Sequence, residues 1–268
     1  MNYTTLKLEK DGSVARVAFC RPEVHNAFNA TVITEMSRLF SEIEKDDDIL
    51  VVVLTGEGKS FCAGADLNWM REVIKQSFEE NLAESNSLAD LFHQIYSFKR
   101  PIIGRINGAA IGGGTGFVAV CDISIAARSA RFSFSEVKIG VVPACVGPYV
   151  IRKMGEGKAR ELFITGERMN AERALAVGLL NKVVDDSELD SEVDQLVQSI
   201  LTSGPEAVSM AKKLVSEVPD MLPEKFKPFT AEMIAHLRIS DEGQEGMAAF
   251  LEKRKPAWAL GDRSREKR

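Results

Sequence analysis

The fold is decided by the stretch Pro101-Ile-Ile-Gly-Arg-Ile-Asn-Gly-Ala-Ala-Ile-Gly-Gly-Gly114. Its first part, Pro101–Ile106, is apolar and rich in β-branched residues, which predicts a strand buried on both faces. Its second part, Gly108-Ala-Ala-Ile-Gly-Gly-Gly114, is built of small residues and opens an apolar helix that we expect to continue to about Val120. A strand, a small-residue turn and a helix in this order predict an α/β core.

The same order of elements occurs earlier in the chain. Ile49–Leu54 is a continuous apolar run and is predicted to be another buried strand. The loop Thr55–Asp66 follows, with the small-residue segment Ser60-Phe-Cys-Ala-Gly-Ala-Asp66, and Phe78–Phe98 then carries the apolar stripe of a helix. Two glycine-containing loops therefore follow buried strands, where backbone N–H groups can approach a ligand closely.

The rest of the chain continues this alternation and then becomes helical. The Asp11-Gly12 pair predicts a tight turn between two strands, and Asn29 is expected to cap a helix. Helices dominate after Gly147, and three further short strands are predicted at Asp122–Ala126, Arg131–Phe134 and Leu180–Val184. We expect residues 1–186 to form the α/β core and residues 187–268 to form a helical region.

Length and composition indicate an ordinary globular protein. The chain has 268 residues, of which 45% are hydrophobic and 27% charged, and its formal net charge is −5. This charge gives no general attraction to nucleic acid or to anionic membranes, so we expect neither as a partner. The beginning of the chain lacks the apolar core of a signal peptide, and no apolar run approaches the ~20 residues of a membrane span. We therefore expect a cytoplasmic protein.

Residue spacing gives no support for metal, disulfide or serine-hydrolase chemistry. No CxxC pair occurs among the four cysteines, which we expect to be buried thiols: Cys20, Cys62, Cys121 and Cys145. The three histidines are far apart in the sequence, and the GxSxG elbow of serine hydrolases is absent. The glycine run lacks both the GxGxxG spacing and the lysine of a P-loop.

The two glycine-containing loops are candidates for binding an oxyanion. A helix that begins near Gly113 adds unpaired N–H groups and the positive end of its dipole. One backbone N–H from each loop would form a two-donor oxyanion hole. The alternative is that each loop is simply a tight turn, since glycine turns are common.

Glu136 is the candidate general acid–base residue. It follows the segment Phe132-Ser-Phe-Ser135 and precedes three apolar residues, Val137, Ile139 and Val141. We expect these neighbours to desolvate the carboxylate partly and to raise its pKa toward a working range. The alternative is an ordinary surface glutamate.

Together these segments resemble the crotonase superfamily, which comprises enoyl-CoA hydratases and isomerases. The resemblance covers nearly the whole chain and rests on segments in the family's order: Arg21-Pro-Glu-Val-His-Asn-Ala27, Phe61-Cys-Ala-Gly-Ala-Asp-Leu67, Gly108–Gly114, Cys121-Asp122, Glu136 to Pro143, Gly166–Val184 and Phe250-Leu-Glu-Lys-Arg-Lys255. It implies a spiral of ββα turns with a C-terminal helical trimerisation region, assembled as a homotrimer or a homohexamer. We expect some apolar positions early in that region to be buried between subunits: Leu189, Val193, Leu196, Val197 and Ile200.

The resemblance also implies roles for particular residues. It places the oxyanion hole at the backbone N–H groups of Ala65 and Gly113, and it puts Glu136 at a catalytic position. Coenzyme A enters as part of the acyl-CoA substrate, so we expect no separate cofactor and no metal. Its binding residues would be Ala27, Ala63, Ala65, Asp66 and Leu67, with Phe250 and Lys253 reaching it from the C-terminal region.

One departure from the family pattern concerns Gly116. Hydratases with two catalytic glutamates carry one of them two positions after the last glycine of the run, where this chain has Gly116. The segments Ala65-Asp-Leu-Asn-Trp-Met70 and Ser135-Glu-Val-Lys-Ile-Gly140 look like those of bacterial methylglutaconyl-CoA hydratases, which also have glycine at that position. The substrates of that group carry a second carboxylate on the enoyl chain.

The resemblance therefore predicts a lyase that adds water to an α,β-unsaturated acyl-CoA. We expect a branched or carboxylated acyl chain of the 3-methylglutaconyl type, as in the breakdown of leucine or acyclic terpenoids. The main alternative is a Δ3-Δ2-enoyl-CoA isomerase, which needs only one glutamate. A decarboxylase of a glutaconyl-type thioester and a non-catalytic acyl-CoA-binding or RNA-associated protein are further alternatives, because fold does not fix function.

Overall fold

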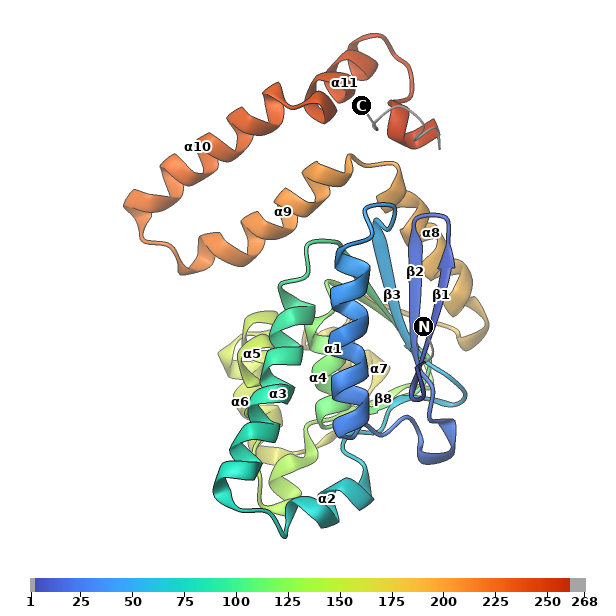
Figure 1. Cartoon of the computed structure of the whole chain (residues 1–268), viewed down its shortest axis with the longest axis vertical. Helices are drawn as coiled ribbons and strands as arrows, with labels where there is room; N and C mark the ends of the chain where they lie inside the picture. Colours follow the sequence, from blue (N-terminus) through green and yellow to red (C-terminus); the bar gives the residue numbers. More distant parts are fainter. Residues whose placement is uncertain (1–2, 261–268) are drawn as a thin grey trace. The chain divides into compact units, whose positions relative to one another are not determined.

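The computed structural model describes residues 3–260, and the chain forms two compact units (Figure 1). The first unit is Met1–Phe98 with Ile102–Val193, and the second is Lys99–Pro101 with Asp194–Arg268. The first unit is α/β and the second is helical, which confirms the predicted fold class. The predicted boundary after residue 186 stays a prediction, and residues 261–268 of the predicted helical region lie outside the described residues.

The larger sheet of the first unit has six strands in the order β1-β2-β3-β5-β7-β10. Their bounds are β1 (Leu6–Asp11), β2 (Val14–Phe19), β3 (Val51–Gly56), β5 (Ile102–Ile106), β7 (Ile123–Ala127) and β10 (Lys182–Val184). β1 and β2 form the predicted hairpin, with Asp11 opposite Val14 and with Gly12 at a φ of +53° in the turn. The other neighbouring strands pair in parallel, which suits the continuous apolar runs of β3 and β5.

A second sheet of four strands, in the order β4-β6-β8-β9, corrects the interpretation of the two loops. Its strands are β4 (Ser60–Cys62), β6 (Ala109–Ile111), β8 (Arg131–Ser133) and β9 (Arg168–Asn170). Only β8 was predicted from the residue pattern, whereas β4 and β6 lie inside stretches interpreted above as loops. Each of these strands has three residues, which is too short for an alternating pattern to appear in the sequence.

The chain passes from the large sheet to the small sheet and then into helices, three times in succession. β3 and β4 precede α2 (Leu67–Val73) and α3 (Phe78–Tyr96); β5 and β6 precede α4 (Gly113–Val120); β7 and β8 precede η2 (Ser135–Ile139), α5 (Gly147–Met154) and α6 (Glu156–Thr165). These turns confirm the predicted spiral of ββα units. Because β4, β6 and β8 are parallel neighbours, the segments that follow their carboxyl ends meet at one edge of the small sheet.

Helices α1 (Ala30–Glu44) and α3 pack side by side (Figure 1). Asn29 caps α1 as predicted, because its side chain accepts a hydrogen bond from the backbone N–H of Val32. Helix α4 is central, with every residue from Gly114 to Val120 buried. The ring of Phe117 on α4 packs against three other rings, at centroid distances of 4.7–5.9 Å: those of Phe19, Phe28 and Phe92.

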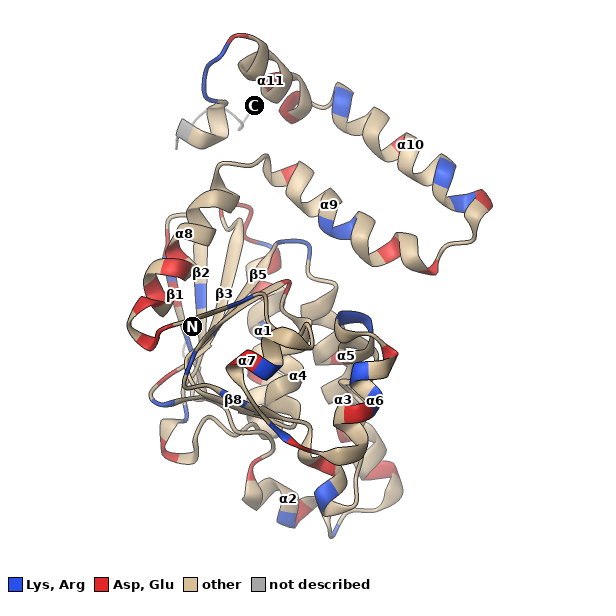
Figure 2. Cartoon of the chain, turned by 180° about the vertical axis from the view of Figure 1, so that it is seen from behind, with Lys and Arg blue, Asp and Glu red and all other residues tan. Residues whose placement is uncertain are grey.

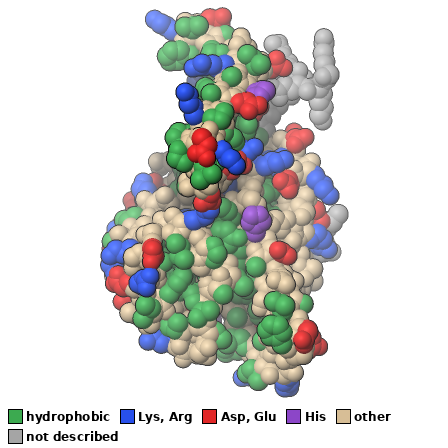
Figure 3. All heavy atoms as spheres, turned by 90° about the vertical axis from the view of Figure 1, so that its left-hand side faces the viewer, with side chains coloured by type: hydrophobic (Ala, Val, Ile, Leu, Met, Phe, Trp, Pro, Cys, Tyr) green, Lys and Arg blue, Asp and Glu red, His purple; other side chains and the backbone are tan. Residues whose placement is uncertain are grey.

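The C-terminal helices include α9 (Pro205–Glu217), α10 (Pro223–Ile239) and α11 (Asp241–Leu251), while α8 (Leu189–Leu201) begins in the first unit. The shorter remaining helices are η1 (Pro22–Val24), α7 (Ala171–Ala176), η3 (Asp186–Glu188), η4 (Val218–Asp220) and η5 (Ala257–Leu260). Hydrophobic side chains lie at the surface of the second unit (Figure 3), and the most exposed are Val215, Ile239, Phe250 and Leu251. Within residues 3–260, no helix is both long and apolar enough to cross a membrane.

Three of the apolar positions expected between subunits are already buried within this chain. Leu189, Val193 and Val197 of α8 are each at most 2% exposed. Their apolar character is therefore explained by the core of the protomer and needs no second subunit.

Candidate active site

The pairing of β4 with β6 brings the two glycine-containing segments into contact. Ser60 lies opposite Ala109 and Cys62 opposite Ala110. A Cβ at Gly114 would lie only 2.0 Å from the carbonyl oxygen of Cys62, so only glycine allows this approach. The two segments are thus adjacent because their backbones pack together, which explains their small residues better than isolated tight turns do.

The backbone N–H groups of Ala65 and Gly113 are available for a ligand. Ala65 forms a parallel bridge with Phe28, but the bonds of that bridge use the carbonyl of Gly64 and the N–H of Asp66. Gly113 is the first residue of α4, where helix N–H groups have no intrahelical partner. Within residues 3–260 neither N–H has a hydrogen-bond acceptor, and both residues are partly exposed. The geometry therefore suits a two-donor oxyanion hole.

The start of α4 is fixed to the small sheet by a buried threonine. The Thr115 hydroxyl lies 2.6 Å from the carbonyl oxygen of Ala110 and 2.9 Å from that of Ser133. The N–H of Gly112 donates to the same Ser133 carbonyl at 2.7 Å. These bonds tie the first turn of α4 to β6 and β8, so the Gly113 N–H is held rigidly relative to the residues that follow β8.

Glu136 follows β8 and lies against this helix start. A Cβ at Gly112 would lie 3.1 Å from Oε1 of Glu136, so the carboxylate sits beside the residue that precedes Gly113. Its Oε2 atom is buried and has no hydrogen-bond partner among residues 3–260. Buried carboxylate oxygens normally have partners, so this one is free to accept a hydrogen bond from water or substrate.

The pKa of Glu136 is raised because burial disfavours the charged carboxylate, which a weaker bond to its own backbone only partly offsets. Both the direction and the cause, desolvation, agree with the prediction from the sequence. Of the three apolar neighbours in the chain, Ile139 and Val141 are 60% and 52% exposed and Val137 is partly buried. The close packing of the carboxylate against Gly112, in the adjacent ββα turn, adds to the burial.

Arg21 and Asn26 organise the site, although the sequence motif that contains them suggested no role for either. Arg21 donates from Nη1 to the carbonyl of Ala27 at 2.6 Å and from Nη2 to Oδ2 of Asp66 at 2.7 Å. Asn26, at a φ of +59°, donates from Nδ2 to the carbonyl of Ser60 at 2.7 Å. Both side chains fasten the segment before α1 to the β4 region. The sequence offered one indication of this role: both polar residues lie shortly before Ala27, a predicted coenzyme A contact.

The predicted coenzyme A residues of the first unit lie along this same segment. Ala27 is buried, Ala63 is partly exposed, and Leu67, the first residue of α2, is 70% exposed. The Asp66 carboxylate is engaged by Arg21 and by the N–H of Asn68. Burial alone would raise the pKa of Asp66, but these bonds lower it overall. The predicted contact of Asp66 with coenzyme A stays a prediction.

The two predicted contacts near the C-terminus belong to the second unit. Phe250 lies in α11 and is 83% exposed, and Lys253 follows that helix with a φ of +56°. Their predicted role at coenzyme A stays a prediction.

Gly116 is enclosed by other side chains. A Cβ at this position would lie 2.2 Å from Cγ1 of Val146 and 3.2 Å from Cζ of Phe92. A larger residue at position 116 fits only if Val146 moves. The packing of Val146 therefore disfavours a glutamate at this position.

The cysteines are all free, but the prediction of four buried thiols holds for two. Cys62 and Cys121 are buried, whereas Cys20 and Cys145 are only partly buried. Burial raises the pKa of the Cys62 thiol to about 12, so this thiol stays protonated although it is next to the site. In the described part of the chain, no three His, Cys, Asp or Glu side chains are grouped in a way that could hold a metal ion.

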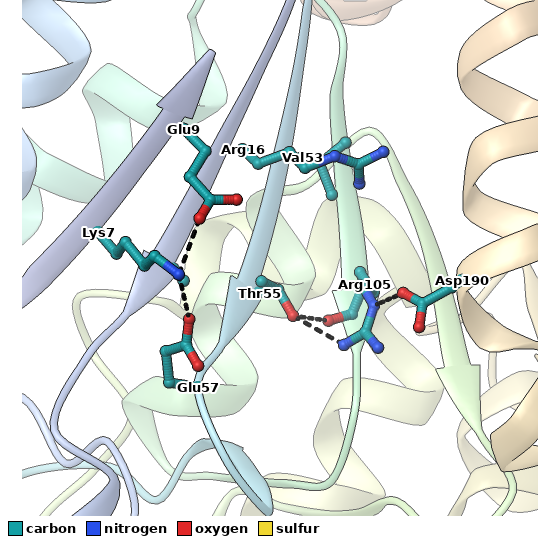
Figure 4. A pocket seen from close by; sticks show the side chains of 9 residues that line it. Lys7, Glu9, Arg16, Val53, Thr55, Glu57, Arg105 and Asp190 are labelled. Atoms are coloured by element: carbon teal, nitrogen blue, oxygen red, sulfur yellow. Dashed lines mark hydrogen bonds and ion pairs between the residues drawn. The ribbon is translucent and has the colours of Figure 1, made fainter. Parts of the chain in front are cut away.

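A separate cavity of about 130 Å³ lies on the six-stranded sheet (Figure 4). Lys7 Nζ lies 2.8 Å from Oε1 of Glu9, and Arg105 Nε lies 2.6 Å from Oδ1 of Asp190. These charges neutralise one another, and residues of both charges are also interspersed along the rest of the chain (Figure 2). The cavity is lined by none of the predicted site residues, and we assign it no part in the reaction.

Comparison with known proteins agrees with this geometry. Residues 9–261 match the sequence profile described as enoyl-CoA hydratase/isomerase. The chain belongs to this family. It is 35% identical to the short-chain-enoyl-CoA hydratase of Clostridium acetobutylicum over 95% of this chain and 97% of that protein. It is 33% identical to the crotonyl-CoA hydratase of Syntrophomonas wolfei over 95% and 98% of the two chains.

Solved structures of the enoyl-CoA hydratase/isomerase family share the fold. The crystal structure of an enoyl-CoA hydratase from Shewanella pealeana superimposes with a TM-score of 0.92 at 38% identity, covering 96% of both chains. The resemblance to the crotonase superfamily is therefore confirmed. The finer resemblance to methylglutaconyl-CoA hydratases stays a prediction.

Proposed function

We propose that this protein adds water across the C2=C3 double bond of an α,β-unsaturated acyl-CoA thioester. The observation that carries the proposal is the position of Glu136, whose partly buried carboxylate lies beside Gly112, the residue before Gly113, and has one oxygen without a partner among residues 3–260. Family membership and similarity to two hydratases support the reaction class. Coenzyme A is part of the substrate in this proposal, and no resident cofactor or metal takes part.

The proposed reaction needs one base and one oxyanion hole. Glu136 accepts a proton from water while the water oxygen bonds to C3, and the electron pair of the double bond moves onto the thioester oxygen. The N–H groups of Ala65 and Gly113 stabilise the enolate by donating to that oxygen. The enolate then collapses, and protonated Glu136 returns the proton to C2, so that only water has been added.

For the substrate we propose a branched or carboxylated enoyl chain of the 3-methylglutaconyl type. The support is the replacement of the second family glutamate by Gly116, with Val146 packed over it. A carboxylate carried by the substrate would then help to hold the attacking water, as the second glutamate does in two-glutamate hydratases.

Isomerisation of a Δ3-enoyl-CoA to the Δ2 isomer is the second candidate function. A single glutamate suffices for it, because the same carboxylate removes a proton from C2 and delivers it to C4. The buried, unpartnered oxygen of Glu136 favours proton transfer and does not discriminate between the two reactions.

A panel of thioesters discriminates between these functions. The purified protein would be incubated with crotonyl-CoA, 3-methylglutaconyl-CoA and a Δ3-enoyl-CoA, and the products identified by mass and chromatography. We expect a mass gain of one water, fastest with 3-methylglutaconyl-CoA. An unchanged mass with a moved double bond identifies the isomerase, loss of carbon dioxide a decarboxylase, and binding without turnover a non-catalytic protein.

We further propose a homotrimer or a homohexamer. The support is the set of large hydrophobic side chains left exposed on the second unit, which a solvated helical surface does not require. Sedimentation velocity at micromolar concentration tests this, and a single monomeric species would contradict it.

A further inference from the structure

Helix α4 carries the proposed oxyanion donor at one end and buried carbonyl groups at the other. Gly113 is its first residue, and Val118 and Cys121 lie at its carboxyl end, where both are buried. The last carbonyls of a helix have no intrahelical partner, and buried carbonyls need one. The question is which group satisfies this end of α4.

Two side chains contribute: Ser124 Oγ donates to the carbonyl of Val118 at 3.2 Å, and Lys153, in the last turn of α5, reaches two carbonyls. Its Nζ donates to the carbonyl of Cys121 at 2.6 Å and lies 3.3 Å from the carbonyl of Val118. Burial lowers the pKa of Lys153, and the neighbouring Cys121 and Asp122 act in the opposite direction. A cation at this end of α4 also complements the negative end of the helix dipole.

The same segment of chain contacts α4 at a second point. Val146, directly before α5, packs on Gly116 in the middle of α4, and Lys153 holds its carboxyl end. Thr115 and Gly112 fix the amino end to the small sheet. The position of α4 along its own axis is therefore set from both ends, and this position determines where the Gly113 N–H points.

We propose that Lys153 is a positioning residue for catalysis, acting through α4 on the Gly113 N–H that holds the thioester oxygen. This inference rests on the proposed function, since it assumes that the oxygen of an acyl-CoA binds at Gly113. Loss of the ammonium group removes the Lys153 hydrogen bonds to the Cys121 and Val118 carbonyls, of which Val118 keeps Ser124 Oγ, and removes the charge that complements the negative end of the helix dipole. The last turn of α4 is then held less firmly. The oxyanion donor then shifts or weakens, while the coenzyme A contacts on other segments stay in place.

The test compares Lys153→Met with Lys153→Arg. Methionine keeps the apolar stem and removes donors and charge, and arginine keeps both. We expect Lys153→Met to lower kcat by about 3- to 30-fold with little change in KM, and Lys153→Arg to recover most of the loss. Lys153→Gln, which keeps an amide donor without charge, replaces the methionine variant if that variant does not fold.

Lys158→Met is the matched control. Lys158 lies on α6, the next helix, and its Nζ pairs with Glu161 at 3.7 Å on the surface. The Lys158→Met substitution removes a lysine charge of the same size without changing a contact of α4, so we expect wild-type kcat. A comparable loss of kcat in Lys158→Met would contradict an effect transmitted through α4.

A spectroscopic measurement separates positioning from mere structural support. Infrared difference spectra of bound butyryl-CoA, labelled at the thioester carbonyl, report how strongly the oxyanion hole polarises that bond. We expect a downshift in the wild type, a smaller downshift in Lys153→Met, and recovery in Lys153→Arg. A wild type without any downshift refutes the proposed oxyanion hole. A full downshift and normal kcat in Lys153→Met, with only a lower melting temperature, overturn the role of Lys153 and leave the proposed function intact.

Discussion

Two glutamates in this protein occupy opposite kinds of environment. Glu35, on α1, accepts hydrogen bonds from the backbone N–H and the hydroxyl of both Thr4 and Thr5, at 2.6–2.9 Å for the shortest contacts. Glu136 lies beside Gly112 and has a buried oxygen with no partner among residues 3–260. Burial alone would raise the pKa of both carboxylates. In Glu35 the four donors outweigh burial and lower its pKa to about 2, whereas in Glu136 burial dominates and the pKa is raised.

The difference shows how one residue type serves two purposes. A carboxylate whose acceptor capacity is filled by the protein holds the chain together and has a low affinity for protons. A carboxylate whose capacity is unfilled contributes little to stability and accepts a proton more readily than an ordinary glutamate does. The first arrangement suits the fastening of an N-terminal strand to a helix, and the second suits catalysis.

The largest expected effect comes from removing the charge of Glu136. Glu136→Gln keeps the shape of the side chain and removes its basicity, so we expect kcat to fall by about 10²–10⁴. Affinity for coenzyme A and the free energy of unfolding should stay near their wild-type values, because the carboxylate stabilises little. Steady-state kinetics and chemical denaturation measure the two quantities. If Glu136→Gln turns over the true substrate at the wild-type rate, Glu136 is a structural residue and not the catalytic base.

The second largest effect on kcat is expected from removing the backbone N–H of Gly113. Gly113→Pro removes one N–H of the proposed oxyanion hole, and we expect kcat to fall by about 10²–10³. Proline is tolerated in the first turn of a helix, but a Cβ at position 113 would lie 2.7 Å from the ring of Phe28, so Gly113→Ala, which adds the Cβ and keeps the N–H, is the matched control. Circular dichroism checks the fold. A folded Gly113→Pro variant with near-normal turnover would exclude Gly113 as a donor.

A glutamate introduced at position 116 tests whether the candidate active site accepts a second carboxylate besides that of Glu136. Gly116→Glu alone collides with Val146 and buries a charge, so we expect a loss of stability of about 3 kcal/mol or more. The double variant Gly116→Glu with Val146→Ala makes room and should recover part of that loss. Thermal unfolding compares the variants, and turnover of crotonyl-CoA shows whether the added acid acts. A single variant as stable as the wild type would mean that Val146 moves freely.

The raised pKa of Glu136 predicts a pH dependence of activity. The base must be unprotonated, so kcat/KM should fall as the pH drops through the pKa of Glu136, by about tenfold per unit below it. The midpoint should lie above the ordinary glutamate value of 4.5. The pH profile of kcat/KM measures this, and the acid limb should disappear in Glu136→Gln. A wild-type midpoint at or below that ordinary value would contradict the desolvated environment.

The smallest expected effect belongs to Glu35 and is confined to stability. We expect Glu35→Gln to lower the free energy of unfolding by about 1–2 kcal/mol at neutral pH, a figure discounted because the carboxylate is partly exposed, and to leave kcat unchanged. Because the folded pKa lies below the unfolded one, this contribution is complete above about pH 4.5 and is lost as the pH falls toward 2. Denaturation at several pH values should show the wild-type and variant curves converging in acid. A constant gap between them would refute the assignment.

Several elements followed from local sequence alone. The Asp11-Gly12 turn, the Asn29 cap and the start of α4 were predicted and confirmed, because each depends on residues close together in the chain. The buried strands β3 and β5 were also predicted, since a continuous β-branched run has few other stable arrangements. Strands β4, β6 and β9 were not predicted, because their formation depends on pairing with segments that are distant in the sequence.

The sequence by itself determined the family, the helical C-terminal region and the residues Ala65, Gly113 and Glu136 as candidates. Only the tertiary structure decided that β4 pairs with β6, that Glu136 lies against Gly112, and that Lys153 helps to satisfy the end of α4. It also added to the predicted desolvation of Glu136 a contact from another ββα turn, at Gly112. The physical reason is that desolvation and hydrogen bonding depend on which groups are close in space, and in a spiral fold those groups come from successive turns of the chain.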